Sequence, residues 1–292
     1  MAGKISTFAK NEMIDHVFKA AYTPPGTLGL WLCLCTATVT IASTGSDITE
    51  TDYTGYVRLN FTGASQFAAA TGRKIVQDAL FTFAAATGVS TSNITDWCIA
   101  DAATGGNVLA FGKFDSAPTG WNVVSGNTPK IASGQVEISI DATTSSNAGF
   151  TTIAANLLLD HMFENDVWTT SSTKIHFGLT TATMTDASTL AAITETDAAG
   201  YARKPVPAAS FDASALVGAT AQNTTNTDVE FDVPTGDSTN DITSLFVCDT
   251  LAGTSATADV LIAYDNSNIT DQAFDTDDEV VVEAGSFTAT LN

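Results

Sequence analysis

The pattern E-x-D-x-x-G-Y-x-R, which combines two carboxylates, a tyrosine and an arginine, occurs twice in this sequence. The pattern could bind a ligand, because its arginine offers a rigid fork of donors. An arginine among many carboxylates, placed after a glycine turn, is expected instead to form a two-pronged ion pair that ties a long loop to the fold. We therefore predict a structural motif, made of Glu50, Tyr56, Arg58, Glu195, Tyr201 and Arg203.

A run of acidic residues near the C-terminal end suggests a second kind of site. Carboxylate oxygens are the ligands that Ca²⁺ prefers, and oxygen-rich loops of β-proteins do bind it. The chain has no D-x-D-x-D-G loop followed by a distant glutamate, so solvated surface charge is the expected role. Calcium stays the alternative, with no other cofactor predicted, and its candidate ligands are Asp275, Asp277, Asp278 and Glu279.

Histidine and cysteine offer little further chemistry. His16 and His161 each follow an aspartate at equivalent places, which we interpret as a helix contact used twice. Cys33 and Cys35 are two residues apart on a predicted strand, so their side chains point to the same face. The sequence has no second cysteine pair with the spacing of a zinc site, and buried free thiols are therefore expected. The sequence contains no phosphate-binding loop, H-E-x-x-H or G-x-S-x-G motif, and we predict that the protein is not an enzyme.

Composition excludes several classes of partner. The 292 residues include 11 Lys+Arg and 32 Asp+Glu, for a net charge of −21, which rules against a nucleic-acid groove. No apolar stretch reaches the length of a membrane span, and the first residues lack the apolar core of a signal peptide. The free cysteines fit folding in a reducing cytoplasm.

The chain is an internal duplication. Met13 to Phe18 matches Leu158 to Phe163 at an offset of 145, and the E-x-D-x-x-G-Y-x-R pattern keeps the same offset. Later blocks match at offsets of 148 and 151, as loop insertions would produce. We predict two homologous domains, residues 1–148 and 149–292.

Each copy reads as a short helix followed by strands. Apolar residues recur at helical spacing over residues 11–21 and again over residues 153–163. Short β-branched or apolar runs then alternate with Gly, Asn, Asp and Ser clusters, which favours an all-β fold of two tandem β-sandwiches, jelly-roll or immunoglobulin-like. The strands expected in the first copy are 28–36, 56–61, 79–83, 94–100, 108–114 and 135–140.

These residues resemble a structural domain of tailed bacteriophages. The resemblance rests on four segments, 30–37, 50–58, 97–109 and 131–134, although the second copy loses the Gly105-Gly106-Asn107 element. Similar domains are described as virion, head-decoration or tail-fibre-associated proteins. The resemblance implies a virion protein without catalysis, folded in the host cytoplasm, with phage capsid or tail proteins as partners. A homo-oligomer, a trimer on a symmetric capsid site, is expected.

The leading functional prediction is a capsid decoration or cement protein. The alternatives are a tail or fibre-associated adaptor, and a carbohydrate-binding receptor-recognition module that would use Trp121 and Trp168. Residues 1–146 carry a net charge of −3 and residues 147–292 carry −18. Crowding so acidic a domain is unfavourable, so the first domain is predicted to dock and the second to be displayed. The N-terminal segment, with Ile5, Phe8 and Met13, is expected to contact neighbouring proteins.

Overall fold

The chain forms two compact units, each described here by itself. Unit 1 consists of Met1–Lys10, Thr23–Ile140 and Asn156–Trp168, and unit 2 consists of Asn11–Tyr22, Asp141–Ala155 and Thr169–Asn292. The computed structural model describes residues 2–19, 29–62, 66–114, 120–141, 148–164, 174–217, 220–251, 260–267 and 272–291.

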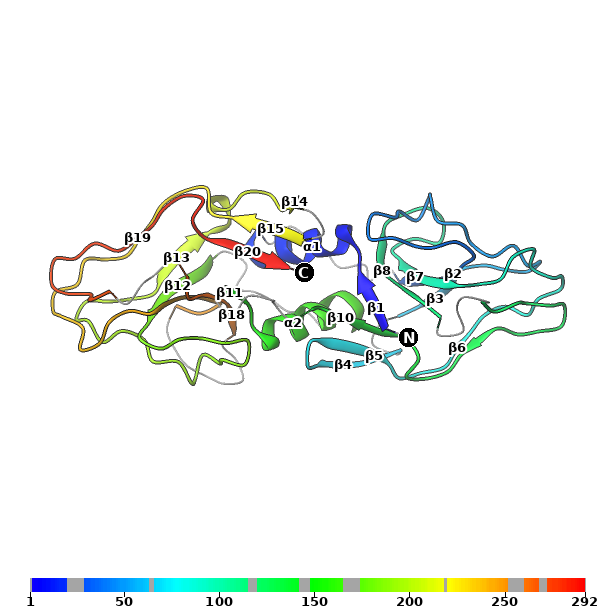
Figure 1. The fold of residues 1–292 in the computed structure, drawn as a ribbon, viewed down its shortest axis with the longest axis horizontal. Coiled ribbons are helices and arrows are strands. Elements are labelled where there is room, and N and C mark those ends of the chain that lie inside the picture. The colour runs from blue at the N-terminus through cyan, green and yellow to red at the C-terminus, as the bar shows by residue number, and fades with distance from the viewer. Residues whose placement is uncertain are drawn as a thin grey trace. The chain divides into compact units, whose positions relative to one another are not determined.

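Unit 1 contains an eight-stranded sheet with the order β3-β2-β7-β8-β1-β10-β5-β4 (Figure 1). Its first strand, β1, lies inside the sheet because it pairs antiparallel with β8 and parallel with β10. The chain segments are β1 (Ala2–Ile5), β2 (Leu30–Cys35), β3 (Leu59–Phe61), β4 (Phe67–Thr71), β5 (Lys74–Gln77), β7 (Asp96–Ala100), β8 (Val108–Lys113) and β10 (Glu137–Ser139). A separate pair joins β6 (Phe81–Thr82) to β9 (Lys130–Ile131).

Unit 2 repeats this order in two sheets, β13-β12-β17-β18-β11 and β20-β15-β14. Strands β11 and β20 lie next to each other, as their counterparts β1 and β10 do. The strands are β11 (Ala148–Phe150), β12 (Lys174–Thr180), β13 (Lys204–Pro207), β14 (Ala215–Val217), β15 (Thr220–Thr224), β17 (Ser244–Cys248), β18 (Leu261–Asp265) and β20 (Thr288–Leu291). The pair β16 (Val229–Glu230) and β19 (Val281–Val282) matches β6 and β9. The all-β class and the tandem duplication are therefore confirmed.

Each repeat has one main helix, and a hydroxyl side chain begins it. Helix α1 spans Thr7–Lys19, and α2 spans Thr152–Leu159 and continues as the π-helical turn η3 (Asp160–Glu164). The Ser6 hydroxyl accepts a hydrogen bond from the Ala9 amide and donates to the Val108 carbonyl. Thr151 makes the equivalent pair of bonds to Ala154 and Leu261. Each cap thus fastens the helix start to a strand of its own repeat.

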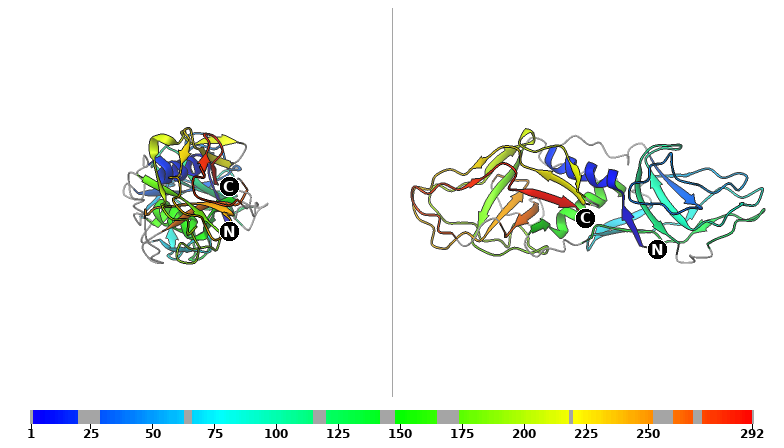
Figure 2. Two further views of the ribbon diagram at one scale, coloured as in Figure 1. Left: turned by 90° about the vertical axis from the view of Figure 1, so that its left-hand side faces the viewer. Right: turned by 45° about the horizontal axis from the view of Figure 1, so that its top comes forward.

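Both helices change unit along their length. Residues from Asn11 onward in α1 belong to unit 2, and residues from Asn156 onward in α2 and η3 belong to unit 1. Figure 1 and the right-hand view of Figure 2 show α1 (blue) beside β15 (yellow) and β20 (red). Each compact unit therefore contains a helical segment from the other sequence repeat. The predicted domain boundary between residues 148 and 149 stays a prediction.

The N-terminal segment is used inside the fold. Ile5 and Met13 are buried, and Phe8 is half-buried. Ile5 lies on β1, an interior strand that cannot be removed without opening the sheet. The prediction that Ile5 and Met13 contact neighbouring proteins was therefore wrong, because both side chains are buried in the core of this chain. None of the helices in the described ranges combines the length and apolar character needed to cross a membrane.

Candidate functional site

Arg58 is the centre of the motif in the first repeat. Its Nε and Nη2 donate to Glu50 Oε1 at 2.9 and 2.8 Å. The other donors bind three backbone carbonyls at 2.8 Å each, those of Gly45, Ala102 and Gly105. All five N–H groups of the guanidinium are thus used. The Arg58 side chain is only 5% exposed and that of Glu50 is 22% exposed. The buried guanidinium therefore joins Glu50 to residue 45 and to the 102–105 loop.

Tyr56 extends the same network to strand β2. Its hydroxyl donates to Glu50 Oε2 at 2.6 Å and accepts from the Leu34 amide at 3.1 Å. Burial raises the pKa of this phenol well above its ordinary range, and the neighbouring Glu50 carboxylate adds to the shift. The hydroxyl therefore stays protonated and acts as a fixed link between the strand and the carboxylate.

Asp52 fastens a second loop. Its carboxylate accepts from the Thr91 amide at 2.8 Å and from the Thr91 hydroxyl at 2.5 Å. These two bonds, the hydroxyl first, lower the pKa of Asp52 below its ordinary value. Gly55, at φ +98°, makes the turn between Asp52 and Tyr56, and a Cβ there would meet the Ala85 carbonyl. The spacing of the motif thus serves two anchors on either side of one turn.

The second repeat forms the same ion pair and the same aspartate anchor. Arg203 Nε donates to both oxygens of Glu195 at 3.2 and 3.1 Å, and Nη2 donates to Oε1 at 2.5 Å. Tyr201 donates to Glu195 and accepts from the Leu179 amide. The Asp197 carboxylate accepts from the amide and hydroxyl of Thr239, which lower its pKa. Two copies therefore preserve one arrangement of anchors.

One pair of facing residues in the sheet next to the arginine differs between the two copies, and the two changes compensate each other in size. Cys33 pairs with Cys98 across β2 and β7, whereas Gly178 pairs with Phe246 across β12 and β17. A Cβ at Gly178 would come within 2.1 Å of the Phe246 ring, so the glycine makes room for the phenylalanine. The ring centroid then lies 5.6 Å from the Arg203 guanidinium, a cation–π distance.

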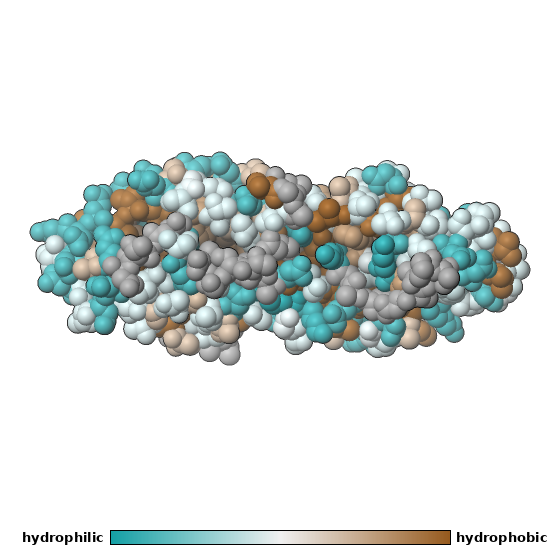
Figure 3. All heavy atoms as spheres, viewed as in Figure 1, coloured by the Kyte–Doolittle hydropathy of each residue, from teal (hydrophilic) through white to brown (hydrophobic). Residues whose placement is uncertain are grey.

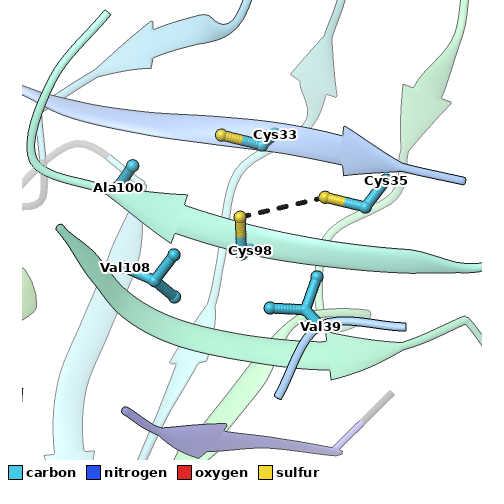
Figure 4. Packing of buried hydrophobic residues seen from close by; sticks show 6 residues of the cluster. All are labelled: Cys33, Cys35, Val39, Cys98, Ala100 and Val108. Atoms are coloured by element: carbon cyan, nitrogen blue, oxygen red, sulfur yellow. Dashed lines mark hydrogen bonds between the residues drawn. The ribbon is translucent and has the colours of Figure 1, made fainter. Parts of the chain in front are cut away.

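The four cysteines are buried free thiols. Cys33, Cys35 and Cys98 pack with Val39, Ala100 and Val108 (Figure 4), and the Cys35 and Cys98 sulfurs are 3.9 Å apart. Burial raises the pKa of the Cys248 thiol to about 12. The hydrogen bond with Cys33 lowers the pKa of Cys98, but the hydrogen bond with Cys35 and burial outweigh it and raise that pKa above its ordinary value. These thiols pack as small apolar groups.

The repeated Asp-His pairs lie on the helices. The Asp15 carboxylate accepts hydrogen bonds from Ser214, and the Asp160 carboxylate accepts one from the Ala70 amide. His161 is buried and His16 is half-buried. The pairs lie far from the arginine motifs along the chain, at positions on the helices rather than on the loops that those motifs join.

The carboxylates in and beside the acidic loop bind backbone amides and a hydroxyl within the described residues, and Trp121 packs against another ring. Asp278 accepts from the Asp275 amide, and Asp237 accepts from the Thr276 amide and hydroxyl. Across the described residues, no three His, Cys, Asp or Glu side chains gather so as to hold a metal ion. Trp121 is half-buried and packs edge-on against Phe114. Trp168 lies outside the described residues.

Sequence reasoning missed the partners of these residues. Thr91 and Thr239 fix the aspartates of the motif, and Ser6 and Thr151 begin the helices. Each of the four is a hydroxyl at an equivalent place in the two copies, so comparing the copies position by position would have found them.

A duplicated all-β chain whose repeated E-x-D-x-x-G-Y-x-R motif anchors loops in both copies has the architecture of a structural protein. The chain belongs to the family described as Podophage GP4 fiber I protein gp80, whose model matches residues 4–139 and again residues 149–290. The protein is therefore a structural protein of tailed-phage virions, built by tandem duplication. No curated protein matches the sequence.

Proposed function

We propose that this chain is a non-enzymatic tail-fibre component of the virion. The observation that carries the proposal is the family match, which covers both repeats and whose description is that of a fibre protein. Capsid decoration, the leading prediction from sequence, has no comparable support. The tail or fibre-associated alternative takes its place.

The anchored motifs support a mechanical role. Asp52 and Thr91, like Asp197 and Thr239, tie loops that lie at a distance in the sequence, and Arg58 ties two more. A group with a perturbed pKa is a candidate for catalysis when it faces a cleft with a free proton site. The Tyr56 hydroxyl instead has both a carboxylate acceptor and an amide donor in place. We propose loop rigidity as the use of this motif.

Equivalent loop tips in the two repeats differ in chemistry. Ser90 bonds to the Val123 carbonyl as Ser238 bonds to Phe274, which makes Val89 and Val124 the counterparts of Asp237 and Asp275. Val89 is 59% exposed and Val124 is 44% exposed, and both aspartates are exposed too. Figure 3 shows apolar surface (brown) at the tip of unit 1 and mostly hydrophilic surface (teal) at the tip of unit 2.

This difference supports docking by the first repeat. Exposed valines at a loop tip lose unfavourable hydration when a partner covers them, whereas clustered carboxylates must be desolvated. We therefore propose that residues 1–148 bind a phage tail protein through the Val89 and Val124 tip, while residues 149–292 face solvent. Copies of the chain are proposed to assemble as a homo-oligomer around a symmetric attachment site, a trimer being the simplest case.

Labelling of assembled particles tests the proposal. Antibody against the chain should mark the tail region of particles of the phage that encodes it. Label spread over the head would restore the decoration hypothesis.

A paired substitution tests the docking tip. Val89→Asp with Val124→Asp should reduce incorporation into particles, because both changes copy the acidic tip of the second repeat. The matched control, Asp237→Val with Asp275→Val, should leave incorporation unchanged. Equal effects of the two pairs would contradict docking by the first repeat.

A further inference from the structure

The helix of each repeat packs on the sheet of the opposite repeat. In unit 2, the Phe18 ring of α1 lies 4.9 Å from that of Phe211 and 6.3 Å from that of Phe287, measured between centroids. In unit 1, the Phe163 ring of η3 lies 6.2 Å from that of Phe67 on β4. Phe18 and Phe163 are equivalent residues of the duplication, so the exchange is reciprocal.

Polar contacts accompany the rings at equivalent places. Asp15 accepts hydrogen bonds from the Ser214 amide and hydroxyl, both at 3.0 Å, and from Asn223 Nδ2 at 3.4 Å. Asp160 accepts from the Ala70 amide, and Asn156 Oδ1 accepts from the Arg73 amide at 2.7 Å. The donors lie on or beside the hairpins β14–β15 and β4–β5, which correspond between repeats.

Neither helix is long enough to persist without this support. Helices of 13 and 8 residues are marginal in water, since most of their stability comes from packing an apolar face. Those faces are buried, with Met13, Ile14, Val17 and Phe18 in α1 and Leu158, Leu159, Met162 and Phe163 in the second helix. Each repeat thus depends on the other for the folding of its helix and for the cover of its hairpin.

We propose that the two repeats are obligate partners, in which the helix of each is the docking element for the hairpin of the other. Asp15 and Asp160 are the residues that set the pairing, because each carboxylate meets backbone N–H donors of the opposite hairpin. The partner that fits each hairpin is a helix carrying the apolar-apolar-Asp-His-apolar-Phe motif that both repeats contain. This pairing is independent of the tail-fibre role.

Crossed substitutions in the full chain test the proposal by hydrogen–deuterium exchange. Asp15→Ala should speed amide exchange in residues 210–224 by about 10- to 100-fold, as expected for the loss of charge-assisted hydrogen bonds, and leave residues 67–77 unchanged. Asp160→Ala should do the reverse. Asp15→Asn and Asp160→Asn, which keep the size of the side chain, should give the same crossed pattern with a smaller amplitude.

A control on the same helix separates docking from general helix damage. Glu12→Gln changes a half-exposed carboxylate one turn away and should leave both hairpins as protected as in the unchanged chain. Faster exchange in the hairpin of the substituted residue's own repeat would overturn the proposal. So would equal exchange in both hairpins, or no change in either.

Discussion

Replacing Arg58 with alanine should loosen two loops while the strands beneath them stay paired. The substitution removes five hydrogen bonds and leaves Glu50 without its ion-pair partner, at a position where the carboxylate side chain is only 22% exposed. Hydrogen bonds to a charged group contribute about 1.5–3 kcal/mol each, and removing one partner of a buried pair costs about 3–5 kcal/mol. Because Glu50 can gain some water, we expect about 3 kcal/mol.

Hydrogen–deuterium exchange measures this loss where it occurs. A cost of about 3 kcal/mol corresponds to roughly 100-fold faster exchange of amides whose opening breaks the contact. Those amides lie in residues 44–47 and 101–107, which Arg58 joins through Gly45, Ala102 and Gly105. Urea unfolding followed by the fluorescence of the buried Trp97 gives the cost to the unit as a whole.

A surface ion pair in the same unit supplies the control. Lys74 Nζ lies 3.0 Å from Glu137 Oε2, with side chains 46% and 32% exposed. Exposed pairs contribute about 0.2–1 kcal/mol, so Lys74→Ala should cost little. If Arg58→Ala destabilised the protein no more than Lys74→Ala, the claim that the arginine anchors these loops would be refuted.

Three further outcomes follow from the geometry. Gly178→Ala should destabilise unit 2 by about 1–3 kcal/mol in urea unfolding, because the new Cβ meets the Phe246 ring. Adding Phe246→Cys should restore much of the lost stability. If it did not, the claim that Gly178 makes room for Phe246 would be contradicted. All four thiols should resist a maleimide in the folded protein and react in denaturant, since they are buried; rapid labelling before unfolding would count against that burial. Asp52 has a pKa below its unfolded value, so its stabilising contribution is present above about pH 4 and is lost as the pH falls through the lowered pKa. Amide exchange in residues 87–92 should therefore become faster in acid, and Thr91→Val should abolish that acid sensitivity. A sensitivity that persists in the variant would assign it to another group.

Patterns within one repeat predicted much of the fold. The runs around Leu30–Cys35, Asp96–Ala100 and Val108–Lys113 are continuous and apolar because both faces of these strands are covered, and each is a strand in the structure. Strand β4 was missed because its sequence, FAAAT, is rich in alanine, which has a low strand propensity. Strand β1 was missed because its four residues are too few to show an alternating apolar and polar pattern.

The exchange of helices could not be read from periodicity. The spacing of Met13, Val17 and Phe18 shows that one face of the helix is buried, but any apolar surface satisfies that pattern. Both repeats also carry nearly the same motif, so the sequence does not distinguish a helix packed on its own repeat from one packed on the other. The decision depends on long-range contacts such as Asp15 with Ser214, which lie 199 residues apart.

The reciprocal position of the two helices also bears on how such a chain avoids uncontrolled growth. A polypeptide with one protruding arm and one receptive surface can recruit copy after copy, and the series ends only if it closes into a ring. Placing two arms and two receptive surfaces on one polypeptide gives a closed pair at fixed one-to-one stoichiometry. The outer loops of each half can then differ in chemistry without disturbing this pairing, as the valine tip and the aspartate tip do.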